Sequence, residues 1–129
     1  MIVDSSALVA ILFKEADAVT FASALRDAPV CAVAAPTVVE ATMVAEGRAG
    51  PGMARELDDL LGAVDAEIVP FTAEHAALAR DAWRRYGKGR HPAGLNLGDC
   101  FAYALAVARD EPLLFKGDDF ARTDVKAAI

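Results

Sequence analysis

Four acidic positions in the chain fall where a predicted strand ends or a predicted helix begins. Asp4 follows the first apolar residues, Glu40 lies in the first turn of a predicted helix, and Asp99 opens a long apolar stretch. The pair Asp118-Asp119 follows a short apolar run near the C-terminus. Clustered carboxylates repel one another and burial raises their pKa values, so such a group is costly unless a cation compensates.

Hard divalent cations meet this need, because Mg²⁺ typically takes one or two carboxylates together with waters and phosphate oxygens. The chemistry indicated is metal-assisted hydrolysis of a phosphodiester. Each acid also has a structural interpretation: Asp4 and Asp99 as helix caps, Glu40 as a favourable charge near a helix start, and Asp118-Asp119 as a turn. Asp99 is the hardest to explain structurally, because a lone carboxylate in an apolar helix needs a partner.

Short apolar segments alternate with helical patterns along the chain. We expect strands at residues 2–3, 30–34, 67–71 and 113–116. We expect helices at 5–13, 16–28, 37–49, just beyond Gly50-Pro51-Gly52, at 73–86 and at 97–109, with Ser5 or Ser6 as the first N-cap. The alternation predicts a single α/β domain over residues 1–129, with a mostly parallel sheet of about four or five short strands flanked by helices. The carboxyl ends of parallel strands share one edge, where several of the acids can meet.

Composition narrows the classes of function. The 129 residues are 55% hydrophobic, with a net charge of −6 from 19 acidic and 13 basic residues. This balance argues against broad nonspecific binding of nucleic acid, but not against an enzyme that holds phosphate through cations. Cys31 and Cys100 lie in apolar runs. We therefore expect both to be buried free thiols, as in proteins of a reducing compartment. We expect no signal peptide and no membrane span, and therefore a cytoplasmic protein.

Four segments, taken together, resemble the motifs of the PIN-domain family and, within it, the VapC toxins of bacterial toxin–antitoxin pairs. They are MIVDSSAL (1–8), PTVVE (36–40), LNLGDCFAYALA (95–106) and LFKGDDF (114–120). The resemblance covers essentially the whole chain, in order and at fitting spacing. It implies an endoribonuclease that depends on Mg²⁺ or Mn²⁺.

The resemblance also implies roles for single residues. Asp4, Glu40 and Asp99 match the three core acids that bind the metal. Hydroxyl positions beside that site are matched by Ser6 and Thr37.

Two positions near the later acids follow from the same resemblance. Asn96 matches a polar residue before the third acid. Relatives often space two acids apart before Phe, whereas Asp118 and Asp119 are adjacent here. We expect Asp118 to be the fourth catalytic and metal-site acid, and Asp119 to orient the loop.

The chain has one concentration of basic residues, between positions 80 and 91. We expect RNA contacts from four of them: Arg84, Arg85, Lys88 and Arg90. The alternative is a solvated helix face on which Asp81 pairs with Arg85. In this region we expect Trp83 to lie in the core.

VapC-like proteins are implied to bind a VapB-like antitoxin, to cut an RNA substrate and to form homodimers. Apolar surface near Phe13, Val19 and Phe21 is expected to form part of the antitoxin groove. One alternative function is a noncatalytic PIN-like module that only binds a partner. Another is a phosphatase of the haloacid-dehalogenase type, which requires a second Asp where this chain has Ser6.

Overall fold

The computed structural model describes residues 1–129 and has a four-stranded sheet at its centre, in the order β3–β2–β1–β4. The strands are β1 (Ile2–Val3), β2 (Ala32–Ala34), β3 (Glu67–Val69) and β4 (Leu113–Leu114). Every pairing is parallel. The predicted α/β class is therefore confirmed, with a sheet that is parallel throughout.

Six α-helices and one short 3₁₀ helix surround the sheet. They are α1 (Ser5–Leu12), α2 (Ala18–Asp27), α3 (Ala35–Ala49), α4 (Gly52–Ala63), α5 (Ala73–Tyr86), α6 (Leu97–Arg109) and η1 (Phe120–Arg122). None of these helices combines the length and the apolar character that a membrane span requires.

Two details of the helix starts differ from the prediction. The N-cap of α1 is Asp4, and not Ser5 or Ser6, because the Asp4 carboxylate accepts the backbone N–H of Ser6. Helix α3 begins at Ala35, before the proline, because Pro36 is well tolerated in a first turn. Glu40 therefore lies in the second turn of α3 and not in the first.

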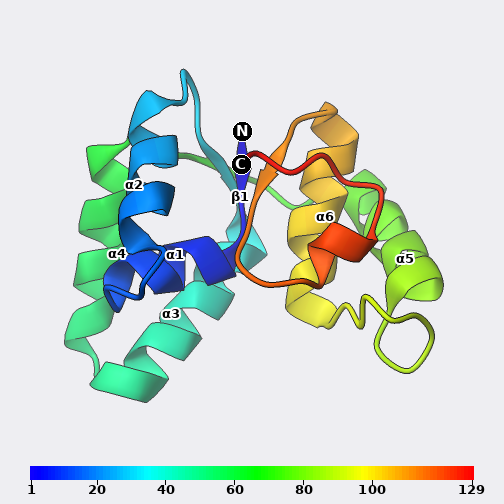
Figure 1. Cartoon of the computed structure of the whole chain (residues 1–129), viewed down its shortest axis with the longest axis horizontal. Helices are drawn as coiled ribbons and strands as arrows, with labels where there is room; N and C mark the ends of the chain where they lie inside the picture. Colours follow the sequence, from blue (N-terminus) through cyan, green and yellow to red (C-terminus); the bar gives the residue numbers. More distant parts are fainter.

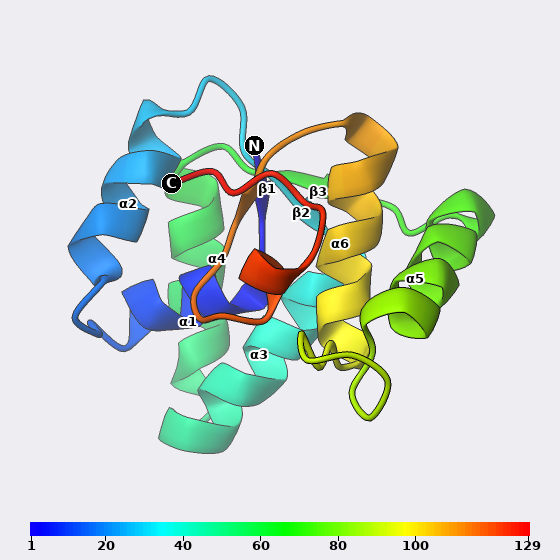
Figure 2. The same cartoon turned by 45° about the vertical axis from the view of Figure 1, so that its right-hand side comes forward.

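The two faces of the sheet carry different helices (Figures 1 and 2). Successive strand side chains point to opposite faces, so β1 contributes one residue to each of two apolar clusters. Ile2 packs in the cluster that includes residues of α5 and α6. Val3 packs in the cluster that includes residues of α1, α2, α3 and α4.

Helix α6 is the central helix of its layer, as predicted. Its small residues Ala102, Ala104 and Ala106 are buried, together with Leu105. Their size lets the helix approach β1, β2 and β4 as well as α3 and α5. The packing places the first turn of α6, which carries Asp99, beside α3 and near the carboxyl ends of the strands.

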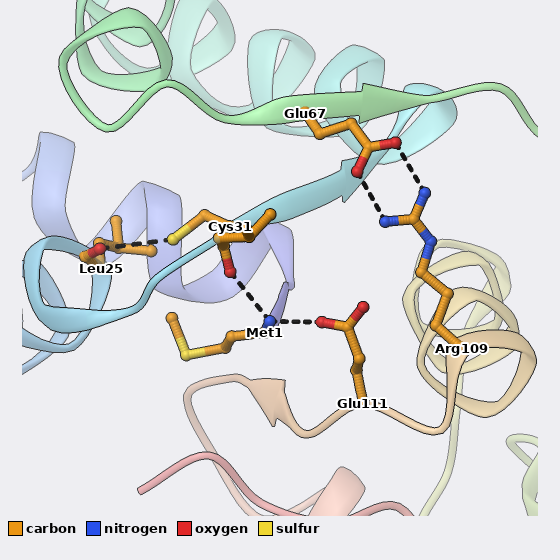
Figure 3. A network of polar contacts seen from close by, with 7 residues as sticks. Met1, Leu25, Cys31, Glu67, Arg109 and Glu111 are labelled. Atoms are coloured by element: carbon orange, nitrogen blue, oxygen red, sulfur yellow. Dashed lines mark hydrogen bonds and ion pairs between the residues drawn. The ribbon is translucent and has the colours of Figure 1, made fainter.

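The opposite edge of the sheet, at the amino ends of the strands, is closed by paired charges (Figure 3). The amino group of Met1 donates to Val30 O (3.0 Å) and pairs with Glu111. Glu67, the first residue of β3, forms a two-pronged ion pair with Arg109 of α6, with both N–O distances at 2.7 Å. The carboxylates at this edge therefore have cations, which distinguishes them from the acids at the carboxyl-end edge.

Candidate active site

Asp4 is the residue at which β1 passes into α1. Its backbone N–H donates to Leu114 O (2.9 Å), which fixes it against the end of β4. The side chain is 2% exposed. Its Oδ2 accepts from Ser6 N (2.9 Å) and Ser6 Oγ (2.5 Å), whereas its Oδ1 is buried and has no hydrogen-bond partner. Burial raises the pKa of Asp4, and the bonds from Ser6 oppose that rise. Capping therefore uses one carboxylate oxygen and leaves the other free.

Ser6 joins the two strand ends that carry the acids. Its hydroxyl donates to Asp4 and accepts the backbone N–H of Lys116 (2.9 Å). The Lys116 ammonium is turned toward Glu15 and Asp17, with a distance of 3.5 Å to Asp17. Ser6 is thus beside Asp4, as the resemblance implied, and it positions the loop after β4.

Asp99 lies in the first turn of α6, where it forms a reciprocal capping box with Asn96. Asp99 N donates to Asn96 Oδ1, and Asn96 N donates to Asp99 Oδ2, both at 2.9 Å. The pKa of Asp99 is raised to about 7, mainly by burial and further by the negative charges of Asp4, Asp119 and Glu40. Asn96 therefore orients Asp99, and again only one carboxylate oxygen takes part in the cap.

Helix α3 brings two further oxygen groups to this edge. Thr37 is fully buried, and its Oγ1 has no hydrogen-bond partner. Glu40 Oε2 is also buried without a partner. Burial raises the pKa of Glu40, and the charge of Asp4 raises it further. Because the charge of Asp4 raises the pKa of both Glu40 and Asp99, these three acids form one electrostatic cluster.

The two candidates for the fourth acid differ in how they affect this cluster. The charge of Asp119 raises the pKa of both Asp4 and Asp99. Asp118 is not among the causes of either rise. The predicted catalytic role of Asp118 stays a prediction, and of the two acids it is Asp119 whose charge acts on the cluster.

The donor set of this cluster fits a hard cation. Three buried oxygens lack partners: Asp4 Oδ1, Thr37 Oγ1 and Glu40 Oε2. A buried acceptor without a donor is costly, and a cation or its waters would satisfy it. No three His, Cys, Asp or Glu side chains form a ready-made metal cage. Mg²⁺ usually keeps several waters and takes few direct carboxylate ligands, so a site for it does not require such a cage.

The basic residues of α5 are mostly engaged with other groups. Arg84 pairs with Asp81 (2.9 Å), and Arg85 pairs with Asp124 (3.0 Å). The pair between Asp81 and Arg85, which belonged to the alternative interpretation of this region, does not form, because the guanidinium of Arg85 pairs with Asp124 of the C-terminal segment. Arg85 also donates to the hydroxyl of Tyr86 (2.7 Å).

Two apolar grooves lie on either side of the start of α6. One, of about 510 Å³, lies between α5 and α6, and Trp83, Lys88 and Phe101 are among its lining residues. The other, of about 490 Å³, is lined by residues of α3 and the start of α6, including Glu40. Both grooves include Asn96 in their walls.

Trp83 is not a core residue, contrary to expectation. Its side chain is 46% exposed at the first groove, and the guanidinium of Arg90 lies 4.0 Å from its ring centroid. The amphipathic pattern of α5 does not reveal this exposure, because the groove leaves one side of the helix uncovered.

Comparison with known proteins agrees with this fold and arrangement. The PIN domain family profile matches residues 1–126. A protein named Ribonuclease VapC from Mycolicibacterium smegmatis is 50% identical over 127 residues, which cover 98% of each chain. Ribonuclease VapC28 of Mycobacterium tuberculosis is 45% identical and covers 100% of this chain and 98% of its own.

A solved structure adds evidence on the fold alone. The VapC20 toxin of Mycobacterium tuberculosis, described as cleaving the sarcin–ricin loop, superposes with a TM-score of 0.78 at 16% identity. The match covers 96% of this chain and 95% of that toxin. Together, these similarities show that the chain belongs to the PIN-domain family, among the VapC proteins.

Proposed function

We propose that the chain is the toxin of a toxin–antitoxin pair and acts as an endoribonuclease that depends on Mg²⁺, or alternatively on Mn²⁺. One observation carries the metal-dependent chemistry. The oxygens Asp4 Oδ1, Thr37 Oγ1 and Glu40 Oε2 are buried without partners beside Asp99, whose pKa is raised by burial and by the neighbouring acids. The relatives named as VapC ribonucleases support RNA as the substrate.

In this proposal Asp4 and Asp99 hold the metal directly. Glu40 and the fourth acid hold it through water or orient the attacking water. Asp119 is favoured for the fourth position over Asp118 because its charge acts on Asp4 and Asp99. The bound cation would polarise the phosphate and acidify a water molecule.

The residues around the acids would fix their orientation before substrate binds. Ser6 holds one oxygen of Asp4, and Asn96 holds one oxygen of Asp99. Ser6 and Asn96 are both uncharged. Each fixes the orientation of a carboxylate by holding one of its oxygens, and the second oxygen stays available to a cation. Preorganised groups of this kind need little rearrangement during reaction.

RNA would pass along the groove between α5 and α6. Lys88 lines that groove together with Asn96, which connects it to the acids. Arg84 and Arg85 are held in ion pairs, so their contacts with RNA would require those pairs to exchange. Arg90 stacks on Trp83, and this pair offers a cation beside an aromatic face.

Exposed apolar side chains support the proposed protein partners, a VapB-like antitoxin and a second copy in a homodimer. Near the acids, Met43 is 70% exposed and Leu97 is 73% exposed. On the first helices, Val19 is exposed, whereas Phe21 is 5% exposed and belongs to the core. The expectation that Phe21 contributes to an antitoxin groove is therefore wrong. Cytoplasmic location is part of the proposal, because Cys31 and Cys100 are free thiols.

The test is cleavage of total RNA by the purified chain with Mg²⁺, with Mn²⁺ and with EDTA. We expect cutting that needs the metal and that Asp99→Asn loses. Asp58→Asn, which removes an exposed carboxylate of α4, is the control and should cut normally. Full activity of a folded Asp99→Asn protein would contradict the proposal.

The toxin role has its own test in growing cells. Induced expression of the wild-type chain should arrest growth, and Asp4→Asn and Asp99→Asn should not. Arrest by both acid variants would instead favour a noncatalytic binding module.

A further inference from the structure

Gly98 occupies the first turn of α6, between Leu97 and Asp99. Its φ is not in the left-handed region, in contrast to Gly50 at +90° and Gly117 at +97°. The backbone at position 98 therefore does not require glycine. Alanine is the better helix former, so a different constraint must favour glycine here.

That constraint is the carboxyl group of Glu40. A Cβ atom built on Gly98 would overlap Cδ, Oε1 and Oε2 of Glu40, at separations far below the 3.0 Å that real Cβ atoms respect. Glu40 comes from α3 and Gly98 from α6, and these two helices are in contact. The Glu40 carboxyl group thus lies directly against the Gly98 backbone, in the space that a side chain would occupy.

We infer that Gly98 is a positioning residue, whose missing side chain admits the Glu40 carboxyl group to the acidic cluster at the strand edge. Any larger residue at position 98 would exclude that carboxyl group. The consequence for metal binding rests on the proposed function, whereas the steric relation between Gly98 and Glu40 does not.

The overlap involves only the far end of a flexible side chain. Glu40 can therefore turn away, while the backbones of α3 and α6 stay in place. Glu40 Oε2 has no hydrogen-bond partner, and the carboxyl group keeps a single hydrogen bond, with Ser5, against such a turn. A methyl group at position 98 is consequently expected to remove one acid from the site without unfolding the protein.

The experiment is a double-mutant cycle with Gly98→Ala, Glu40→Ala and the double variant, with Mn²⁺ affinity measured by calorimetry. We expect Gly98→Ala to weaken binding about tenfold, as the loss of a supporting group at a metal site does. The double variant should bind no more weakly than Glu40→Ala alone, since both changes remove the same carboxyl group. Unchanged affinity in Gly98→Ala, or losses that add in the double variant, would overturn the inference.

Gly47→Ala is the matched control. Gly47 is also helical and lies in the same helix as Glu40, and a methyl group at this position would meet no other atom within 4 Å. This variant should bind Mn²⁺ as the wild type does. If Gly98→Ala fails to fold, the double variant shows whether the overlap with Glu40 is the cause. Truncation of Glu40 to Ala should then restore folding. An unfolded double variant would overturn the inference.

A crystal structure of the metal-free Gly98→Ala protein separates this inference from the proposed function. If the wild type binds no Mn²⁺, the metal proposal fails, but the crystal structure of the Gly98→Ala protein still decides the role of Gly98. We expect the Glu40 carboxyl group to have left its place against residue 98. A carboxyl group that stays there, with α6 displaced instead, would overturn the inference.

Discussion

Replacing Asp99 with Asn should stabilise the metal-free protein at alkaline pH. Burial and the neighbouring acids raise the pKa of Asp99 from 3.8 to about 7. The folded protein therefore binds this proton more tightly than the unfolded chain does. Its stability falls as the pH rises from about 4 to about 7, because stability decreases wherever the folded state binds more protons.

The size of the effect follows from the two pKa values. The difference between about 7 and 3.8 corresponds to at most about 4 kcal/mol of unfolding free energy at pH 8. Asn cannot ionise, so Asp99→Asn escapes this penalty, and its side-chain oxygen can still accept the N–H of Asn96. The variant should be the more stable protein at pH 8, and the difference should vanish toward pH 4.

The assay is urea unfolding in EDTA at a series of pH values, for the wild type, Asp99→Asn and the surface control Asp58→Asn. Saturating Mn²⁺ should then narrow the difference by stabilising the wild type, by about 2.7 kcal/mol at 100 times the dissociation constant. The reasoning is refuted if Asp99→Asn is the less stable protein at pH 8 in EDTA, or if its advantage does not change with pH.

Three further changes test separate parts of the site. Asp119→Asn should weaken Mn²⁺ binding about tenfold in calorimetry, and Asp118→Asn should not; the opposite order would assign the fourth position to Asp118. Ser6→Ala removes a donor to Asp4 and should lower the unfolding free energy by about 1–3 kcal/mol; an unchanged urea midpoint would show that the hydroxyl is dispensable. Lys88→Ala should raise KM for RNA at low salt and reduce the salt dependence of binding, and an unchanged KM would remove Lys88 from the RNA interface.

Local signals made part of the structure predictable from the sequence. Helices α5 and α6 begin and end where expected, because Thr72 and Asn96 are strong N-caps and the helical periodicity is continuous. The parallel sheet followed from the alternation of short apolar runs with helices. The acids Asp4 and Asp99 were recognisable because each stands alone where a strand ends or an apolar helix begins.

Other features depend on contacts between distant segments, which no local pattern encodes. Arg85 pairs with Asp124, 39 positions away, in place of the nearby Asp81. The choice between Asp118 and Asp119 depends on how the loop after β4 turns toward the cluster. Gly98 was visible in the sequence only as a residue of a motif, because its relation to Glu40 arises where α3 meets α6.

The most direct test of the metal site is an anomalous difference map from crystals of the chain that contain Mn²⁺. We expect a peak at the carboxyl-end edge of the sheet, in contact with the carboxylates of Asp4 and Asp99 and near Glu40. A map without a peak at this edge, from crystals that hold Mn²⁺ at millimolar concentration, would contradict the central claim that these acids form a metal site.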